Sequence, residues 1–380
     1  MQMVSNTQWH IFCKIVDNFG DIGVCWRLAQ QLQSEHQLTV HLYIDDLSVA
    51  KQLIPKLDIS LQQQTIQNIT TIAWHTNTKF THAAAVVIES FACELPQAYM
   101  AIMQADTAWI NLEYLSAETW VDDFHANNAK RGHLTRHFFF PGFTAKTGGL
   151  IREHHFVNTH QALANSTPPQ TNLFNNLAPM PNAGLKVSLF CYPHAPINTL
   201  LSAMAACHQP INCYVPAGNI LPIVANFFGQ KTLAIGEKIT HQNLHLQVIP
   251  FLSQNDYDSL LSQCDINFVR GEDSWVRAIW AGKPFIWQPY LQSEQTHIKK
   301  LHAFLGLYYE KCDATIKASV INLHNAWLST KVEHTVWQDY LNNLASLKIY
   351  HLQQTNTLLQ QPDLATKLVI FSQKILKKIA

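Results

Sequence analysis

Short runs of apolar residues alternate with stretches of helical periodicity along most of the chain. This alternation predicts parallel β-sheets covered by helices. In the first half, the predicted strands are Trp9–Val16, Leu38–Ile44, Thr70–Trp74, Ala85–Ile88, Ala108–Asn111 and His137–Phe140. Between the first two strands, Val24, Leu28 and Leu32 recur every four residues on one face. That spacing predicts a helix over residues 23–34.

The apolar pattern stops and restarts near the middle of the chain. Residues 158–184 contain four prolines among Asn, Thr and Gln, a composition typical of a linker. Beyond it, the predicted strands are Leu185–Tyr192, Ile211–Val215, Leu246–Phe251, Ile266–Val269 and Pro284–Trp287. We therefore predict an α/β protein with two Rossmann-like, doubly wound domains, 1–165 and 184–361, joined by a linker at 166–183 and facing a central cleft.

The last segment of the chain, Leu364–Ile379, is amphipathic, with lysines beside apolar residues. Such a helix can lie on a membrane surface or pack on a domain. No run of the sequence approaches the roughly 20 apolar residues that cross a bilayer. We therefore expect residues 362–380 to pack back on the first domain and expect no membrane partner.

Composition and charge narrow the class of protein. Hydrophobic residues make up 47% of the 380 residues, and 26 Lys and Arg balance 26 Asp and Glu. Nucleic-acid binders usually have a basic excess, so no nucleic-acid partner is expected. The 8 cysteines form no C-x-x-C pair, which predicts reduced core thiols in the cytoplasm. Lys14 and Asp17 interrupt the first apolar stretch, which argues against a signal peptide.

Two patterns raise the possibility of a bound metal. The histidine pairs are His133/His137 and His241/His245. No Glu follows the first His of either pair, so neither forms H-E-x-x-H. Asp256 and Asp258 form a D-x-D tripeptide, but Ser253 followed by Asp256 resembles a capping box that opens a helix at 257–264. We favour the cap and expect no metal.

A D-N-F-G-D-I-G segment joins the first predicted strand to the first predicted helix. Ligands of doubly wound sheets bind at this edge. Asp17 and Asp21 can support acid–base chemistry, since one carboxylate can face a substrate while the other orients it. The alternative is that Asp21 is the N-cap of the helix.

Dinucleotide binding by the same loop is a further alternative. It requires G-x-G-x-x-G, whereas the loop has only Gly20 and Gly23 with an Asp between them. A carboxylate there would repel a pyrophosphate. Asp45 and Asp46, after the second strand, are weak candidates for the acid that binds a ribose. An NAD-dependent oxidoreductase is therefore the least favoured interpretation.

A second strand-to-helix turn in the other half has the sequence R-G-E-D-S. A helix N-terminus presents unpaired N–H groups and a positive dipole end to anions. Gly271 allows close backbone approach, Ser274 adds a hydroxyl, and Arg270 adds a positive charge. This combination suits a diphosphate without a metal. Glu272 and Asp273 can hold a sugar hydroxyl or orient the arginine, and Asp273 can alternatively cap the helix.

Four aromatic residues of the second half are candidates for a nucleobase pocket. Phe251 and Tyr257 can sandwich a base, because aromatic faces stack on any nucleobase. Phe190 and Tyr192 end the first strand of this half and can line the same pocket. Ordinary core packing is the alternative for Phe251 and Tyr257.

Two long motifs resemble the protein-arginine rhamnosyltransferases that modify bacterial elongation factor P. They are W-H-I-F-C-K-I-V-D-N-F-G-D-I-G-V-C-W-R-L-A at Trp9–Ala29 and F-V-R-G-E-D-S-W-V-R-A at Phe268–Ala278. The resemblance spans essentially the whole chain. It implies a GT-B fold and transfer of L-rhamnose from dTDP-β-L-rhamnose, with inversion, to an arginine of elongation factor P. This modification activates the factor for relief of ribosome stalling at polyproline, and no cofactor is implied.

The resemblance also implies roles for individual residues. Asp17, Asp21 and Glu272 match the essential acidic positions, with Asp21 as the base. The positions that match substrate- and nucleotide-binding ones are Asn18, Phe19, Gly20, Phe190, Tyr192, Phe251, Gln254, Tyr257, Arg270, Gly271, Asp273, Ser274 and Tyr290. Leu291 stands where the family tends to have a proline after the tyrosine. A GT-B transferase with a small-molecule or lipid acceptor and a non-catalytic nucleotide-sugar binding protein are the remaining alternatives.

Overall fold

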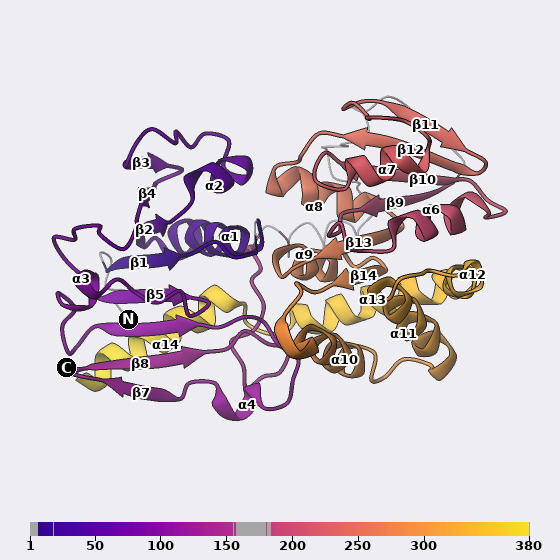
Figure 1. Ribbon diagram of the computed structural model, residues 1–380. Helices are drawn as coiled ribbons and strands as arrows, with labels where there is room; N and C mark the ends of the chain where they lie inside the picture. The colour runs from indigo at the N-terminus through magenta and orange to yellow at the C-terminus, as the bar shows by residue number, and fades with distance from the viewer. Residues whose placement is uncertain (1–6, 18, 155, 157–179, 181–183, 380) are drawn as a thin grey trace. The chain divides into compact units, whose positions relative to one another are not determined.

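The computed structural model describes residues 7–17, 19–154, 156, 180 and 184–379 (Figure 1). The chain divides into two compact units. Unit 1 comprises Met1–Gln161 and Leu359–Ala380, and unit 2 comprises Ala162–Leu358. The predicted linker, 166–183, lies outside the described residues except for Met180.

Unit 1 is built on an eight-stranded sheet in the order β3-β4-β2-β1-β5-β6-β8-β7. The strands are β1 Gln8–Cys13, β2 Thr39–Ile44, β3 Gln63–Ile66, β4 Ile69–Ala73, β5 Val86–Ser90, β6 Ala108–Leu112, β7 Asn128–Arg131 and β8 Leu134–Phe139. The helices are α1 Phe19–His36, α2 Leu47–Leu53, α3 Gln97–Met100, α4 Val121–Phe124 and α14 Leu364–Ile379. Six strands are parallel, and their order is the 3-2-1-4-5-6 order of the Rossmann fold.

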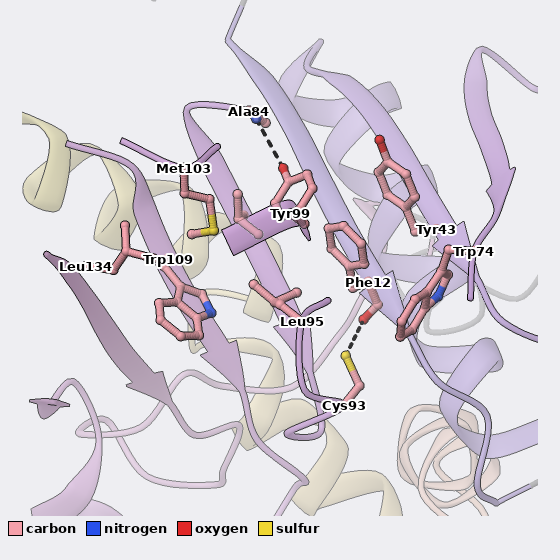
Figure 2. Packing of buried hydrophobic residues seen from close by; sticks show 11 residues of the cluster. Phe12, Tyr43, Trp74, Ala84, Cys93, Leu95, Tyr99, Met103, Trp109 and Leu134 are labelled. Carbon is pink, nitrogen blue, oxygen red and sulfur yellow. Dashed lines mark hydrogen bonds between the residues drawn. The ribbon is translucent and has the colours of Figure 1, made fainter. Parts of the chain in front are cut away.

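The central strands β1, β5 and β6 are buried on both faces, as is usual for parallel strands covered by helices and loops. Phe12 of β1 lies in an aromatic cluster shown in Figure 2. Its ring stacks on Tyr43 with centroids 4.4 Å apart and meets the edge of Tyr99 at 4.6 Å. The Tyr99 hydroxyl accepts the Ala84 amide at 3.2 Å, so the polar end of this buried ring is also satisfied.

Unit 2 repeats the design with a six-stranded sheet in the order β11-β12-β10-β9-β13-β14. Its strands are β9 Leu185–Leu189, β10 Ile211–Pro216, β11 Lys238–His241, β12 Leu244–Ile249, β13 Ile266–Arg270 and β14 Phe285–Gln288. Its helices are α6 Ile197–Ala205, α7 Leu221–Phe227, α8 Gln254–Gln263, α9 Asp273–Ala281, η2 Ser293–Gln295, α10 Thr296–Tyr308, α11 Ala314–Leu328, α12 His334–Asn342 and α13 Leu344–Leu359. The five parallel strands again follow the Rossmann order.

The C-terminal helix α14 packs on α1 and β6 of unit 1. The Phe371 ring lies 5.3 Å from Phe139, and the Leu364 amide donates to the Leu150 carbonyl. Gln31 of α1 donates to Asp363 at 3.0 Å, which ties the start of α14 to the first helix. The apolar side of the helix therefore faces protein. No helix among the described residues is both long and apolar enough to span a membrane.

Three strands were absent from the sequence prediction: β3, β7 and β11. Each is short, polar and antiparallel to its neighbour at the edge of its sheet. Alternation of apolar residues cannot reveal such strands, because little of their surface enters the core. The cysteines are all free, and all but Cys312 are buried, as expected for core thiols.

Candidate functional site

Each sheet has one point where the strand order reverses, and there the carboxyl ends of two parallel strands open a crevice. In unit 1 this switch point lies between β1 and β5, and the loop with both aspartates follows β1. In unit 2 it lies between β9 and β13. Phe190 and Tyr192 follow β9, and Gly271 follows β13. Most of the predicted site residues therefore sit at, or next to, the switch point of their own unit.

Asp21 anchors the loop between β1 and α1. The helix begins at Phe19, so Asp21 is its third residue, and the alternative that Asp21 is the N-cap is wrong. Its Oδ2 accepts the backbone amides of Val16 at 2.7 Å and Asp17 at 2.8 Å. The carboxylate thus reaches back along the chain, as the third residue of a capping box does.

The environment of the Asp21 carboxylate combines burial with hydrogen bonding. Burial raises the pKa of Asp21, while the two amides and the Tyr114 hydroxyl act in the opposite direction. The Tyr114 hydroxyl donates to Oδ1 at 3.1 Å. The result is a desolvated carboxylate of fixed orientation, the kind of group that serves as a base or as an anchor for a cation.

Asp17 and Gly20 form a close backbone contact in the same loop. The Gly20 amide donates to the Asp17 carbonyl at 2.6 Å. A Cβ at position 20 would lie 2.6 Å from Oδ2 of Asp17, so a larger residue there would displace the Asp17 carboxylate. Asp17 is buried, and Phe19 is partly exposed at the start of α1. The predicted Asn18 lies outside the described residues.

The structure weakens the dinucleotide interpretation of this loop. Asp46 is the N-cap of α2, where its carboxylate accepts the amides of Ser48 and Val49. Asp45 accepts the Ile15 amide at 2.9 Å. Both carboxylates proposed as ribose ligands therefore stabilise local backbone.

In unit 2 the guanidinium of Arg270 lies against two aromatic rings. Its central carbon is 4.4 Å from the Phe190 centroid and 4.6 Å from the Tyr192 centroid. It also donates to the Cys191 carbonyl at 3.4 Å. Such cation–π contacts contribute about 0.5–2 kcal/mol each. They fix a positive charge beside the start of α9.

Hydrogen bonds between Arg270 and Ser274 close the turn from β13 to α9. Gly271 adopts φ +62°, a left-handed conformation that favours glycine. The Ser274 hydroxyl accepts the Arg270 amide at 3.0 Å and also donates to the Arg270 carbonyl. The prediction assigned this hydroxyl to a phosphate, but in the structure its hydrogen bonds close the turn. The helix ends as expected at Gly282, with φ +64°.

The two acidic residues of this turn differ in their surroundings. Glu272 occupies the N-cap position of α9 without a side-chain capping bond, and Asp273 is the first helical residue. The Gln254 amide donates to Asp273 at 3.3 Å. Asp273 is therefore oriented from α8, and the cap alternative for it is wrong. Both acidic side chains are partly exposed.

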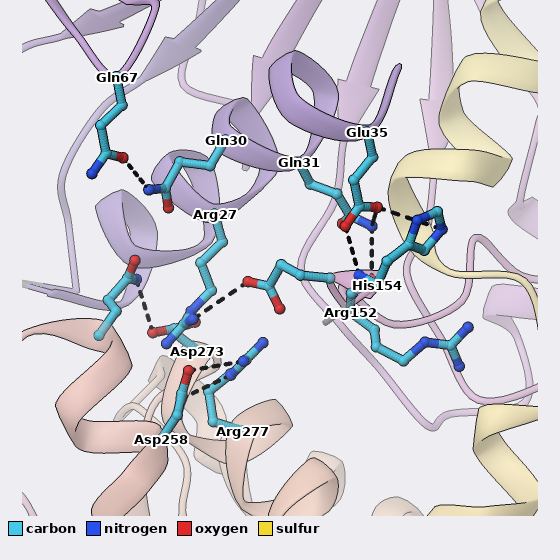
Figure 3. Close-up of polar contacts among 12 residues, drawn as sticks. Arg27, Gln30, Gln31, Glu35, Gln67, Arg152, His154, Asp258, Asp273 and Arg277 are labelled. Atoms are coloured by element: carbon cyan, nitrogen blue, oxygen red, sulfur yellow. Dashed lines mark hydrogen bonds and ion pairs between the residues drawn. The ribbon is translucent and has the colours of Figure 1, made fainter. Parts of the chain in front are cut away.

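The D-x-D tripeptide has a structural role. Ser253 caps α8, and its hydroxyl accepts the Asp256 amide at 3.2 Å, which confirms the predicted cap. Asp258 forms a two-point ion pair with Arg277 of α9, at 2.9 and 2.8 Å (Figure 3). Arg277 is buried, so this pair fixes α8 against α9.

The aromatic candidates separate into buried and exposed rings. Tyr257 is buried and packs 5.5 Å from Phe190, which fits the core-packing alternative. Tyr290 is 40% exposed and lies 5.9 Å from Tyr192. Phe251 is partly exposed. Tyr192 is buried like Tyr257, so Tyr290 is the exposed ring of this group, and the base sandwich between Phe251 and Tyr257 stays a prediction.

A family model, described as elongation factor P (EF-P) rhamnosyltransferase EarP, matches residues 9–373. The chain belongs to the EarP family. A relative from Pseudomonas putida, named protein-arginine rhamnosyltransferase, is 39% identical over 369 residues, which cover 96% of this chain and 98% of that protein. Membership confirms the resemblance drawn from the two sequence motifs.

Solved structures give the same result for the fold. The structure that describes EarP-mediated arginine glycosylation of translation elongation factor EF-P aligns with a TM-score of 0.70. It is 32% identical and covers 97% of this chain and 99% of that chain. The spinosyn rhamnosyltransferase SpnG, solved with thymidine diphosphate, aligns with a TM-score of 0.53 over 96% of this chain and 99% of that chain. At 9% identity SpnG supports the fold alone, which is GT-B, as predicted.

One residue beside the acidic loop of this EarP family member was missed by the sequence prediction. Tyr114 lies 93 positions from Asp21 along the chain and donates a hydrogen bond to it. No periodicity predicts that contact. Its position soon after a predicted parallel strand, on the ligand-binding edge of the sheet, was the available indication.

Proposed function

We propose that this protein transfers L-rhamnose from dTDP-β-L-rhamnose to an arginine of elongation factor P, with inversion at the anomeric carbon. The observation that carries the proposal is the buried, oriented carboxylate of Asp21 at the switch point of unit 1, in a chain of the EarP family. The transfer would take place in the cytoplasm and would activate the factor for relief of stalling at polyproline.

The main chemical difficulty is that the guanidinium of the acceptor arginine stays protonated. A guanidinium has a pKa above about 12 and a free aspartate one near about 4. For the free groups the difference of roughly 8 units corresponds to about 11 kcal/mol, which disfavours deprotonation by Asp21 before attack. Asp21 instead holds and orients the guanidinium, and it accepts the proton as the C–N bond to the anomeric carbon forms and the bond from that carbon to dTDP breaks. Asp17 assists in positioning, because a planar guanidinium suits paired carboxylate oxygens.

Unit 1 is the proposed acceptor-binding domain, and unit 2 is the proposed nucleotide-sugar domain. Arg270, held between Phe190 and Tyr192, lies beside the start of α9. A helix start and a fixed guanidinium together stabilise the negative charge that develops on departing dTDP. We assign Glu272, at the N-cap position, to the donor sugar, and no resident metal is part of the proposal.

Intact-protein mass spectrometry tests the proposal directly. Unmodified elongation factor P is incubated with dTDP-β-L-rhamnose and either this protein or its Asp21→Asn variant. We expect a gain of one deoxyhexose with the wild type only, and equal affinity of both proteins for thymidine diphosphate. Asparagine keeps the size of the side chain but removes its charge.

Three other results of this experiment would each contradict a different part of the proposal. Nucleotide binding without transfer would point to a small-molecule or lipid acceptor. Weak nucleotide binding by the Asp21→Asn variant would contradict the assignment of the donor to unit 2. Transfer at the wild-type rate by that variant would remove Asp21 from the mechanism.

A further inference from the structure

Tyr114 and Phe91 form a stacked aromatic pair beside Asp21. Phe91 directly follows β5, and Tyr114 lies just beyond β6, so both belong to the ligand-binding edge of the unit 1 sheet. Their ring centroids are 4.4 Å apart, and the planes are inclined by 13°. Both rings are partly exposed. The stack brings one hydroxyl, that of Tyr114, within 3.1 Å of Asp21 Oδ1.

The two oxygens of Asp21 have different partners. Oδ2 accepts two backbone amides, from Val16 and Asp17. Because a carboxylate oxygen has two lone pairs, these amides fill the capacity of Oδ2. Oδ1 accepts the Tyr114 hydroxyl and has lone-pair capacity for one further donor. Of the two oxygens, Oδ1 is therefore the one with capacity to accept a guanidinium N–H of the acceptor.

The segment after β5 carries backbone strain. Phe91, Ala92 and Glu94 have φ values of +57°, +52° and +59°, in a region that residues with a Cβ disfavour. Side chains of β5 and β6 hold this segment in place: the Ala92 amide donates to Asn111 at 3.0 Å, and the Glu94 amide donates to Glu89 at 3.0 Å. Strain of this kind persists where the surrounding structure enforces it, and it concentrates at functional sites.

We propose that Tyr114, held by its stack on Phe91, positions Asp21 for the acceptor arginine. The inference rests on the proposed transfer to arginine. Tyr114 acts through Asp21 and not on the reacting atoms. Its hydrogen bond fixes the plane of the carboxylate and favours the charged form over the neutral one. The charged, oriented Oδ1 then receives the guanidinium.

The Tyr114→Phe variant tests this role, because it keeps the ring and removes only the hydroxyl. We expect kcat for rhamnosylation to fall roughly 10- to 100-fold, the range for one hydrogen bond to a charged group. The low-pH limb of the kcat profile should move to higher pH, because the carboxylate loses a donor that lowers its pKa. Affinity for thymidine diphosphate should not change. Phe91→Leu, which keeps the hydroxyl without the stack, should show a smaller fall in kcat.

Tyr350→Phe is the matched control. Tyr350 donates its hydroxyl to the Tyr308 carbonyl in unit 2, so this variant also loses one tyrosine hydrogen bond. It should retain wild-type kcat and pH profile. A Tyr114→Phe variant with wild-type kcat, or with reduced kcat but an unmoved low-pH limb, would overturn the positioning role. A wild type that transfers no rhamnose would instead overturn the proposed function, and this inference with it.

Discussion

Substitution of Gly20 by alanine tests whether the acidic loop is shaped for chemistry. The new Cβ would lie 2.6 Å from Oδ2 and 3.2 Å from the carboxyl carbon of Asp17. Ordinary contact between such atoms is about 3.5 Å, so the Asp17 carboxylate must move by roughly 1 Å. Misplacement of that size can lower a catalytic rate by about 100-fold.

The effect of Gly20→Ala on stability should be smaller than its effect on rate. Alanine gains up to about 1 kcal/mol over glycine in a helix, and position 20 is the second residue of α1. Overpacking against Asp17 costs about 1–3 kcal/mol. We therefore expect the free energy of unfolding to fall by no more than about 2 kcal/mol, while kcat falls at least about tenfold.

The assay compares kcat, affinity for thymidine diphosphate, and unfolding in urea. Gly306→Ala is the control, because Gly306 is an exposed residue of α10 with no heavy atom near the added Cβ. It should gain about 0.5–1 kcal/mol of stability and keep wild-type activity. Wild-type kcat in the Gly20→Ala variant would refute the reasoning, because the position of Asp17 would then have no effect on the reaction.

Two further predictions concern other parts of the molecule. Arg270→Lys keeps the positive charge but loses the planar group that packs against Phe190 and Tyr192, so affinity for thymidine diphosphate should fall about tenfold by calorimetry; an unchanged affinity would remove Arg270 from the donor site. Burial, with His41 and His82 nearby, lowers the pKa of His10 to about 3, so the unfolded chain binds a proton below pH 6.5 that the folded chain does not. Stability should therefore fall by about 2 kcal/mol from this group as the pH drops from neutral to about 5, and chemical unfolding of His10→Gln should show a shallower pH dependence.

The parts of the fold that could be predicted from sequence are those that bury apolar residues. Every parallel strand had been predicted within a few residues of its observed bounds, because apolar runs such as Ile211–Val215 have to be covered on both faces. The antiparallel edge strands were not predicted, since sequences such as Asn128–Arg131 are exposed throughout. Their pairing is set by the neighbouring strand and not by their own composition.

For the candidate site, too, only part of the arrangement could be predicted from the sequence. Local features were predictable: Gly282 ends a helix in the left-handed conformation and Ser253 begins one. The contact partners of the candidate site residues could not be predicted, because they come from distant segments of the chain. Arg270 meets Phe190 across 80 positions of the chain, and Tyr114 meets Asp21 across 93. Only the order of the strands in the sheet brings these pairs together.

Stabilisation of the helix start and the proposed chemistry are not exclusive roles for Asp21. The amides of Val16 and Asp17 occupy Oδ2, which secures the start of α1. These two bonds hold one oxygen of the carboxylate, and the Tyr114 hydroxyl at Oδ1 completes its orientation. An aspartate that only capped a helix would not need a tyrosine hydroxyl at its second oxygen, and a base in a flexible loop would not be preorganised. One buried carboxylate can serve both purposes because its two oxygens serve different partners.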